Sequence, residues 1–254
     1  MRKMAGWQGA LLVGLLLAGL SGCTTTRENL GSDVTGVLQP FAQGSRIGPC
    51  GERYSAEEGM ELSMVQQQLD EERPRSALAY LEALGYAYPE ARLMEAEALR
   101  QVGELERSSE VYAALRSTCL EADAQRGLAR NAFSRQRPEV ALEYMRRARQ
   151  ASPADARIRN DLGYLLMLRG DHSAAIEEFL TALELDESHG NAASNLVLAL
   201  LQSGQPRRAE AAAQRYRLDS DAFATLQAAV ARSASLPAAP GDTSHALESQ
   251  DETP

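Results

Sequence analysis

The sequence predicts an all-α fold, in which about five helical hairpins stack into a solenoid and a last helix caps the array. Only 5% of the residues are aromatic, which favours closely packed helices over a β-sandwich or a barrel. No strands are evident in the sequence. The strongest observation is an interval of 34 residues, which recurs in two sets: Leu128, Leu162 and Leu196, and Ala141, Ala175 and Ala209.

Residues 1–22 have the pattern of a signal peptide. Arg2 and Lys3 precede an apolar run, Ala10–Leu20, of eleven residues. That run is too short for a transmembrane helix, which needs roughly 20 apolar residues. It ends in Leu20-Ser21-Gly22-Cys23, which resembles the bacterial lipobox. An ordinary secretory signal with an incidental cysteine is the alternative.

The lipobox resemblance implies that Cys23 is acylated and becomes the mature N-terminus. Thr24 follows it, so the aspartate that retains such proteins at the inner membrane is absent. The resemblance therefore implies anchoring by the N-terminal lipid on the periplasmic side of the outer membrane. Residues 23–54 are polar and rich in glycine and proline, and we expect them to form a lipidated tether with a reach of about 30 Å.

The repeat is clearest in Ala156–His189, which resembles a tetratricopeptide (TPR) unit. Leu162-Gly163 match the first helix, Gly170-Asp171 the turn, and Ala175, Phe179 and Ala182 the second helix. Small residues at these positions let two antiparallel helices approach within about 8–10 Å. Weaker units cover about residues 58–88, 89–121, 122–155 and 190–223, and the one at 89–121 has Ser108 where alanine is expected. Residues 55–232 are thus predicted to form the TPR array.

The array is expected to end in a capping helix, because stacked repeats need ends that tolerate water. Phe223, Leu226, Ala229 and Val230 recur on one face of a helix that begins near Asp219. Residues 233–254 have no hydrophobic period and many proline, serine and acidic residues. We expect a disordered acidic tail there.

The composition argues against nucleic-acid binding and catalysis. The net charge is −9, and removal of Arg2 and Lys3 with the signal peptide makes it −11, whereas nucleic-acid binding requires cations that neutralise phosphates. The three histidines, His172, His189 and His245, have no metal-ligand spacing, and no glycine-rich phosphate loop is present. We therefore predict no enzyme, no catalytic residue, no cofactor and no metal site.

A protein partner is expected on the concave surface, which first-helix residues line in such an array. Arginines and asparagines around an apolar floor suit a peptide or a helix; packing of the leucines between repeats is the alternative. The predicted groove residues are Arg126, Arg130, Phe133, Arg157, Asn160, Tyr164, Met167, Asn191, Asn195, Leu198 and Leu201.

The segment 126–159 contains nine arginines against Glu139, Glu143 and Asp155. Such a local excess of positive charge would steer an acidic partner or lipid headgroups to this region. Ordinary solvated helix surface, in a chain that uses arginine for almost every cation, is the alternative.

Cys50 and Cys119 are the cysteines that remain beside Cys23. The periplasm is oxidising, so we predict a disulfide between them; two free buried thiols are the alternative.

The order of lipobox, polar tether, TPR units and acidic tail resembles the TadD-like lipoproteins of the Tad (tight adherence) pilus system. The specific segments are Arg159–Tyr164 (RNDLGY) and Ala193–Leu200 (ASNLVLAL), one repeat apart. The resemblance implies a pilotin-like role for the outer-membrane secretin through which Flp pili emerge. Type IV pilus pilotins and envelope adaptors that recruit peptidoglycan hydrolases are the alternatives.

Overall fold

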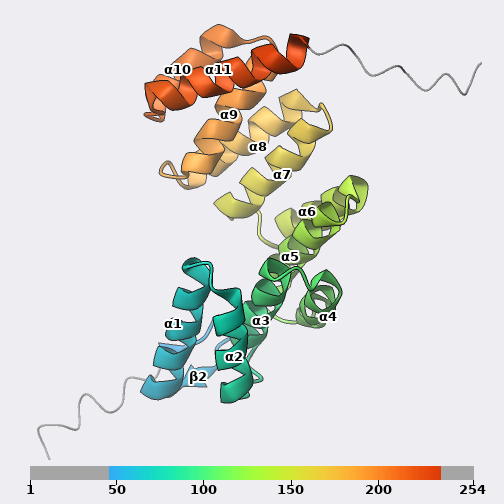
Figure 1. Ribbon diagram of the computed structural model, residues 1–254, viewed down its shortest axis with the longest axis vertical. Helices are drawn as coiled ribbons and strands as arrows, with labels where there is room; N and C mark the ends of the chain where they lie inside the picture. The colour runs from blue at the N-terminus through green and yellow to red at the C-terminus, as the bar shows by residue number, and fades with distance from the viewer. Residues whose placement is uncertain (1–45, 236–254) are drawn as a thin grey trace, which may run out of the picture. The chain divides into compact units, whose positions relative to one another are not determined.

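A computed structural model describes residues 46–235, and over this range the fold is an all-α TPR solenoid, as predicted (Figure 1). Five hairpins pair α1 with α2, α3 with α4, α5 with α6, α7 with α8 and α9 with α10, and α11 follows them. The bounds are α1 Ala56–Asp70, α2 Pro74–Leu84, α3 Pro89–Gln101, α4 Leu105–Leu115, α5 Glu121–Ser134, α6 Pro138–Ala151, α7 Ala156–Leu168, α8 His172–Leu185, α9 Gly190–Gln202, α10 Pro206–Arg215 and α11 Ser220–Ser235.

Local chemistry explains where these helices begin. Proline is the first residue of α2, α3, α6 and α10, a position where its missing N–H costs no hydrogen bond. At α1, the Ser55 hydroxyl accepts from the Glu58 backbone N–H, and the Glu58 carboxylate accepts from the Ser55 N–H. This capping box satisfies two N–H groups that have no partner inside the helix.

The turns inside the hairpins require a left-handed residue. Gly170 and Gly204, one repeat apart, have φ of +87° and +72°, a conformation that glycine adopts without strain. Gln136 lies 34 residues before Gly170 and keeps the same conformation with φ +58°. The turn geometry is therefore maintained even where the sequence lacks the glycine.

Within a hairpin, small residues make room for one large ring. A Cβ added to Gly163 would lie 2.7 Å from the Phe179 ring, and Phe179 is fully buried together with Ala175 and Ala182. Between two successive hairpins, Gly127 of α5 makes room in the same way for Tyr112 of α4, whose ring would meet an added Cβ at 2.2 Å. The glycines of α5 and α7 are thus required by close packing.

Ser108 occupies an alanine position of the repeat because it takes part in a buried polar network. Its hydroxyl donates to the Ala96 carbonyl at 2.8 Å, and the Asn131 side-chain amide donates to the same hydroxyl at 2.9 Å. Ser108 and Asn131 are both buried, and the network joins α3, α4 and α5. The exchange of alanine for serine is compensated by these hydrogen bonds.

The prediction of an irregular tether up to residue 54, without strands, is wrong for its last residues. β1 (Arg46–Ile47) pairs antiparallel with β2 (Arg53–Tyr54), in the register Arg46 with Tyr54 and Ile47 with Arg53. Gly48 and Gly51, interpreted as signs of flexibility, build the connecting turn: Gly51 has φ +85°, and its N–H donates to the Gly48 carbonyl. Tyr54 is fully buried and packs in one cluster with α1–α3, which fixes this ribbon on the array.

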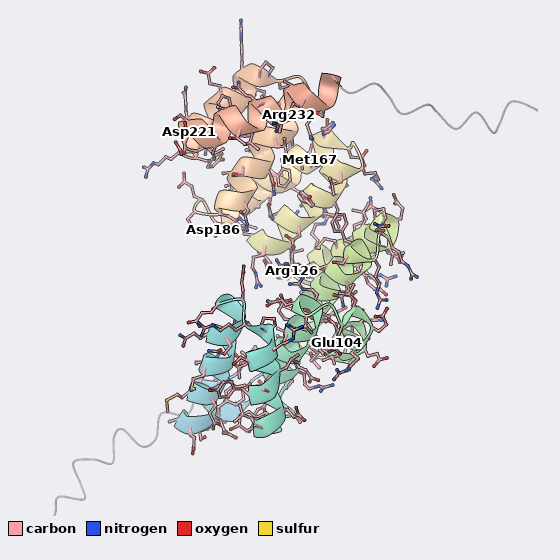
Figure 2. All side chains as sticks on the ribbon, viewed as in Figure 1. Glu104, Arg126, Met167, Asp186, Asp221 and Arg232 are labelled. Carbon is pink, nitrogen blue, oxygen red and sulfur yellow. A yellow bond between two sulfur atoms is a disulfide. The ribbon has the colours of Figure 1, made fainter. Side chains whose placement is uncertain are left out.

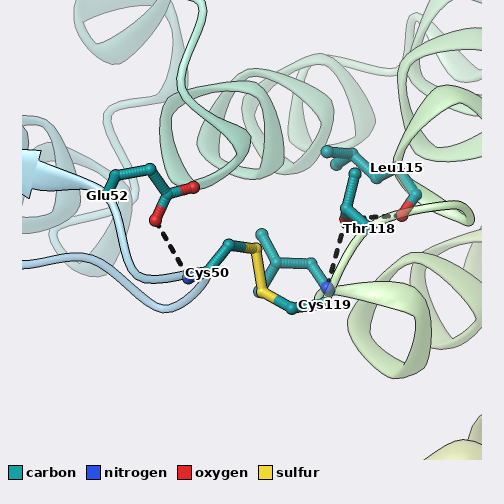
Figure 3. Close-up of a disulfide and its surroundings, with 6 residues drawn as sticks. Cys50, Glu52, Leu115, Thr118 and Cys119 are labelled. Atoms are coloured by element: carbon teal, nitrogen blue, oxygen red, sulfur yellow. Dashed lines mark hydrogen bonds between the residues drawn. A yellow bond between two sulfur atoms is a disulfide. The ribbon is translucent and has the colours of Figure 1, made fainter.

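A disulfide joins Cys50 to Cys119, with the two Cα atoms 5.4 Å apart (Figure 3). The Cys50 N–H donates to the Glu52 carboxylate at 2.9 Å. On the other side, the Thr118 hydroxyl donates to the Leu115 carbonyl and accepts from the Leu120 N–H. The bond therefore ties the ribbon turn to the α4–α5 connection, across 69 residues.

The largest core cluster extends from α5 to α10. Phe223 and Leu226 of α11 pack against it, and α11 continues to Ser235, past residue 232. The predicted signal peptide, Cys23 and the tail after Ser235 lie outside the described residues. Within 46–235, no helix has the length and apolar character needed to cross a membrane.

Candidate functional site

The first helices of the hairpins form the surface on which a partner was predicted; we call the surface of α3, α5, α7 and α9 the first-helix face. Successive first helices are in contact, as α3 is with α5 and α7 is with α9. Arg126 and Met167, both predicted groove residues, are labelled in Figure 2. Phe133 and Tyr164 are each 38% exposed, so two large aromatic side chains on this face are open to a partner.

Met167 does not line the groove, which corrects the prediction. It is 4% exposed and belongs to the core cluster together with Leu165 and Leu166. The reason is that α7 contacts both α8 and α9, and Met167 lies on the side of α7 that packs into the core, whereas the next residue, Leu168, is exposed. Leu198 and Leu201 of α9 are half-buried and pack against the same core, and Asn191 is exposed.

Several polar residues that were predicted to hold a partner bind one another. The Asn195 amide donates to Asn160 Oδ1 at 2.9 Å, and the Asn160 amide donates to Asp161 at 3.2 Å. Arg126 Nε donates to the other oxygen of Asp161 at 2.8 Å. Asn160 is only 7% exposed. This chain of hydrogen bonds sets the register of α5, α7 and α9, and its amides are largely engaged inside the protein.

Glu97 of α3 is a carboxylate that accepts hydrogen bonds from several side chains of α3 and α4, and the sequence analysis did not predict it. Arg100 Nε donates to it at 3.0 Å, Tyr112 Oη at 3.0 Å and the Gln101 amide at 3.1 Å. Burial by itself raises the pKa of Glu97, but the hydrogen bond and charge of Arg100 and the charge of Arg130 outweigh it, and the pKa falls to about 2. The carboxylate is therefore ionised at every physiological pH. The i, i+3 spacing of Glu97 and Arg100 on one helix is the sequence feature from which this ion pair could have been predicted.

Two pockets open on the first-helix face. One has a volume of about 420 Å³ and a charged lining that includes Glu97, Asp123, Arg126, Arg130 and Arg157. Arg157 is anchored there by Asp155 at 2.7 Å and by Asp123 at 3.2 Å. Pro49 of the ribbon turn also lines this pocket, so the disulfide-linked ribbon forms part of its wall.

The second pocket is the aromatic pocket, with a volume of about 260 Å³ between α5 and α7. The rings of Phe133 and Tyr164 meet edge to face, with centroids 6.2 Å apart. Ala129, Met145 and Leu165 also line it. Arg130 lines both pockets, so a cation separates the charged pocket from the aromatic one.

The arginine-rich segment 126–159 is mostly neutralised by ion pairs. Glu178 of α8 forms ion pairs with Arg149 at 2.6 Å and with Arg159 at 2.9 Å. Arg126, Arg135, Arg147 and Arg157 are also paired with carboxylates, and Arg130 has a longer contact, 3.7 Å, with Glu97. Among the described residues this leaves Arg137 and Arg146 without an ion pair, which favours the interpretation of this segment as ordinary helix surface.

Within residues 46–235, no group of three or more histidine, cysteine or acidic side chains is arranged to hold a metal ion. His189 has a structural role, since its Nδ1 accepts from the Ala192 N–H at the start of α9. His172 begins α8, and His245 lies outside the described residues.

Comparisons with known proteins agree with this architecture. The tetratricopeptide-repeat family model matches residues 126–192. The chain is 34% identical over 197 residues to the TPR repeat-containing protein PA4299 of Pseudomonas aeruginosa, which covers 77% of this chain and 79% of the relative.

Among solved structures, TTC0263, a thermophilic TPR protein of Thermus thermophilus, superposes with a TM-score of 0.56 at 21% identity, covering 70% of this chain and 99% of that one. MamA superposes with a TM-score of 0.50 at 16% identity, covering 63% and 96%. Repeats of this kind present extended surfaces for protein partners, which indicates an interaction scaffold. The chain belongs to the tetratricopeptide-repeat family.

Proposed function

We propose that this protein is a pilotin-like scaffold, anchored to the periplasmic side of the outer membrane, that binds the secretin of a Tad (Flp) pilus system. The observation that carries the proposal is the first-helix face, where Phe133, Tyr164 and Arg130 offer aromatic and cationic contacts to a protein partner. The lipobox at Cys23 and the TadD-like segments Arg159–Tyr164 and Ala193–Leu200 support the choice of membrane and machine.

The proposed role combines a lipid anchor in the membrane with a face that binds a protein. Several acyl chains on Cys23 would hold the chain stably, because one chain alone gives only marginal membrane binding. A tether with a reach of about 30 Å would keep the array close to the membrane. A secretin subunit held by the array would then be delivered to the bilayer in which it assembles.

Deletion of the gene is expected to reduce secretin multimers in the outer membrane and to abolish Flp pili. Tyr164→Glu, at an exposed ring of the first-helix face, should weaken binding of the purified secretin periplasmic domain by about tenfold or more, because interface anchors contribute about 1–3 kcal/mol each. Titration calorimetry measures the affinity, and circular dichroism checks that the helical content is unchanged.

Matched controls lie on the second helices. Glu177→Ala on α8 and Arg146→Ala on α6 remove exposed charges, and both variants should bind normally. A dominant effect of Arg146 would move the site to the arginine-rich segment. Normal piliation in the deletion strain would remove the pilus assignment, after which hydrolase pull-down and type IV piliation would test the two alternatives.

Membrane attachment is expected to depend on Cys23 alone. Cys23→Ser should give a folded protein that is released from outer-membrane fractions, because no described helix offers a transmembrane anchor. Fractionation in low and high salt, followed by immunoblotting, measures the distribution. Membrane association of Cys23→Ser that persists in high salt would contradict the single-anchor prediction.

A further inference from the structure

The aromatic pocket has an apolar interior and a polar rim. Phe133 and Tyr164 form its walls, while Ala129, Met145 and Leu165 line its interior. Its volume of about 260 Å³ lies below the range of about 300–1,000 Å³ that is typical of pockets for drug-sized ligands. The size therefore suits a single side chain of a larger partner.

The polar part of the pocket lining has an excess of positive charge. Two arginines, Arg100 and Arg130, line the pocket with one carboxylate, that of Asp161, so its lining carries a net charge of +1. Arg100 is hydrogen-bonded to Glu97, and Arg126 is hydrogen-bonded to Asp161.

Of these arginines, Arg130 has the weakest pairing with a carboxylate. Its nearest carboxylate in the described part of the chain is Glu97 at 3.7 Å, which is beyond hydrogen-bond distance. Burial, and then the charge of Arg100, lower the pKa of Arg130, so its charged form is poorly stabilised. A guanidinium nevertheless stays protonated in proteins. Its N–H groups are therefore available to an anion supplied from outside.

We propose that the aromatic pocket takes one bulky apolar side chain of a partner segment, and that Arg130 pairs with a carboxylate a few residues away in the same segment. The inference rests on the proposed function, in which the first-helix face holds a protein, and it specifies the chemistry of what is held. The apolar side chain would pack against the two rings and fill the pocket beside them, and the carboxylate would pair with the arginine at its rim.

Capped, fluorescently labelled decapeptide pools test this specificity. The first pool contains one Leu or Phe and one Glu two to four residues away. The matched pools replace Glu by Gln, replace Glu by Lys, or replace Leu and Phe by Ala. We expect fluorescence anisotropy to show at least tenfold tighter binding of the first pool than of the others.

The variants separate the two contacts. Tyr164→Ala and Phe133→Ala should each weaken binding of the first pool by about tenfold. Arg130→Glu should no longer bind the first pool and should bind the Lys pool instead. If this charge reversal disturbs folding, Arg130→Gln replaces it and should bind the Glu and Gln pools equally. Arg146→Glu makes the same charge change on the exposed surface of α6 and should alter neither preference.

If the first pool binds no better than the Gln or the Ala pool, the inference is overturned. The secretin periplasmic domain is titrated in parallel, so that the proposed function is judged separately. Secretin binding without a peptide preference removes only the inference, whereas a peptide preference without secretin binding removes only the assigned partner.

Discussion

Replacing Cys50 and Cys119 together by serine is expected to lower the free energy of unfolding by about 4 kcal/mol. The disulfide closes a loop with a sequence separation of 69 residues, and in the chain-entropy model a loop of this size restricts the unfolded chain by about that amount. The bond also secures the ribbon turn, which otherwise contacts the array through the buried Tyr54 and the ion pair of Arg46 with Glu90. Urea unfolding with and without reductant measures the difference.

Hydrogen exchange locates the effect of the disulfide. Amide exchange should accelerate in α1–α4, which lie inside the closed loop, and should stay unchanged in α9–α11, because repeats interact mainly with their neighbours. Reductant should destabilise the wild type and leave the double variant unaffected. Full reaction of both cysteines with a thiol reagent in native, unreduced protein would contradict the disulfide.

The solenoid was predictable because the packing requirement that produces it repeats along the sequence. The same physical demand, a small residue where two helices approach closely, recurs every 34 residues at Ala141, Ala175 and Ala209, all of which are fully buried. A single chain therefore carries several independent copies of the signal. The large ring at Phe179 and the left-handed turn at Gly170 follow from the same repeat geometry.

Features that occur once were harder to predict. The Gly48–Gly51 turn has the composition of a flexible linker, but the burial of Tyr54 and the Cys50–Cys119 disulfide show that it is fixed. Ser108 departs from the repeat, and its reason is Asn131, which lies on a different helix. Such pairings depend on tertiary contacts, so no local pattern indicates them.

The candidate site shows the same division between periodic and particular features. Repeat register placed Phe133 and Tyr164 on the first-helix face, where both are exposed. It did not distinguish them from Met167, because burial at a groove position depends on how the next hairpin packs. It also did not show that Asn160 and Asn195 bind each other.

Glu178→Ala is expected to lower the free energy of unfolding by about 3 kcal/mol, the lower end of the range for breaking a buried ion pair. Glu178 is 7% exposed and joins three helices, because it accepts from Arg149 of α6 and Arg159 of α7. Its loss leaves two guanidinium groups without their carboxylate. The lower end applies because the Arg149 side chain is 39% exposed and recovers part of its hydration. Calorimetry should show a fall in Tm of about 6–12 °C.

Two matched variants decide whether the ion pairs are responsible. Glu178→Gln keeps the shape and one acceptor but removes the charge. Its free energy of unfolding should therefore lie between those of the wild type and Glu178→Ala. The neighbouring Glu177 is exposed and its carboxylate forms no ion pair in the described residues, so Glu177→Ala should change stability by less than about 0.5 kcal/mol. Faster hydrogen exchange should be centred on α6–α8, the helices that the carboxylate joins. Equal losses for Glu177→Ala and Glu178→Ala would mean that helix propensity, rather than the pairing with Arg149 and Arg159, determines the stability here.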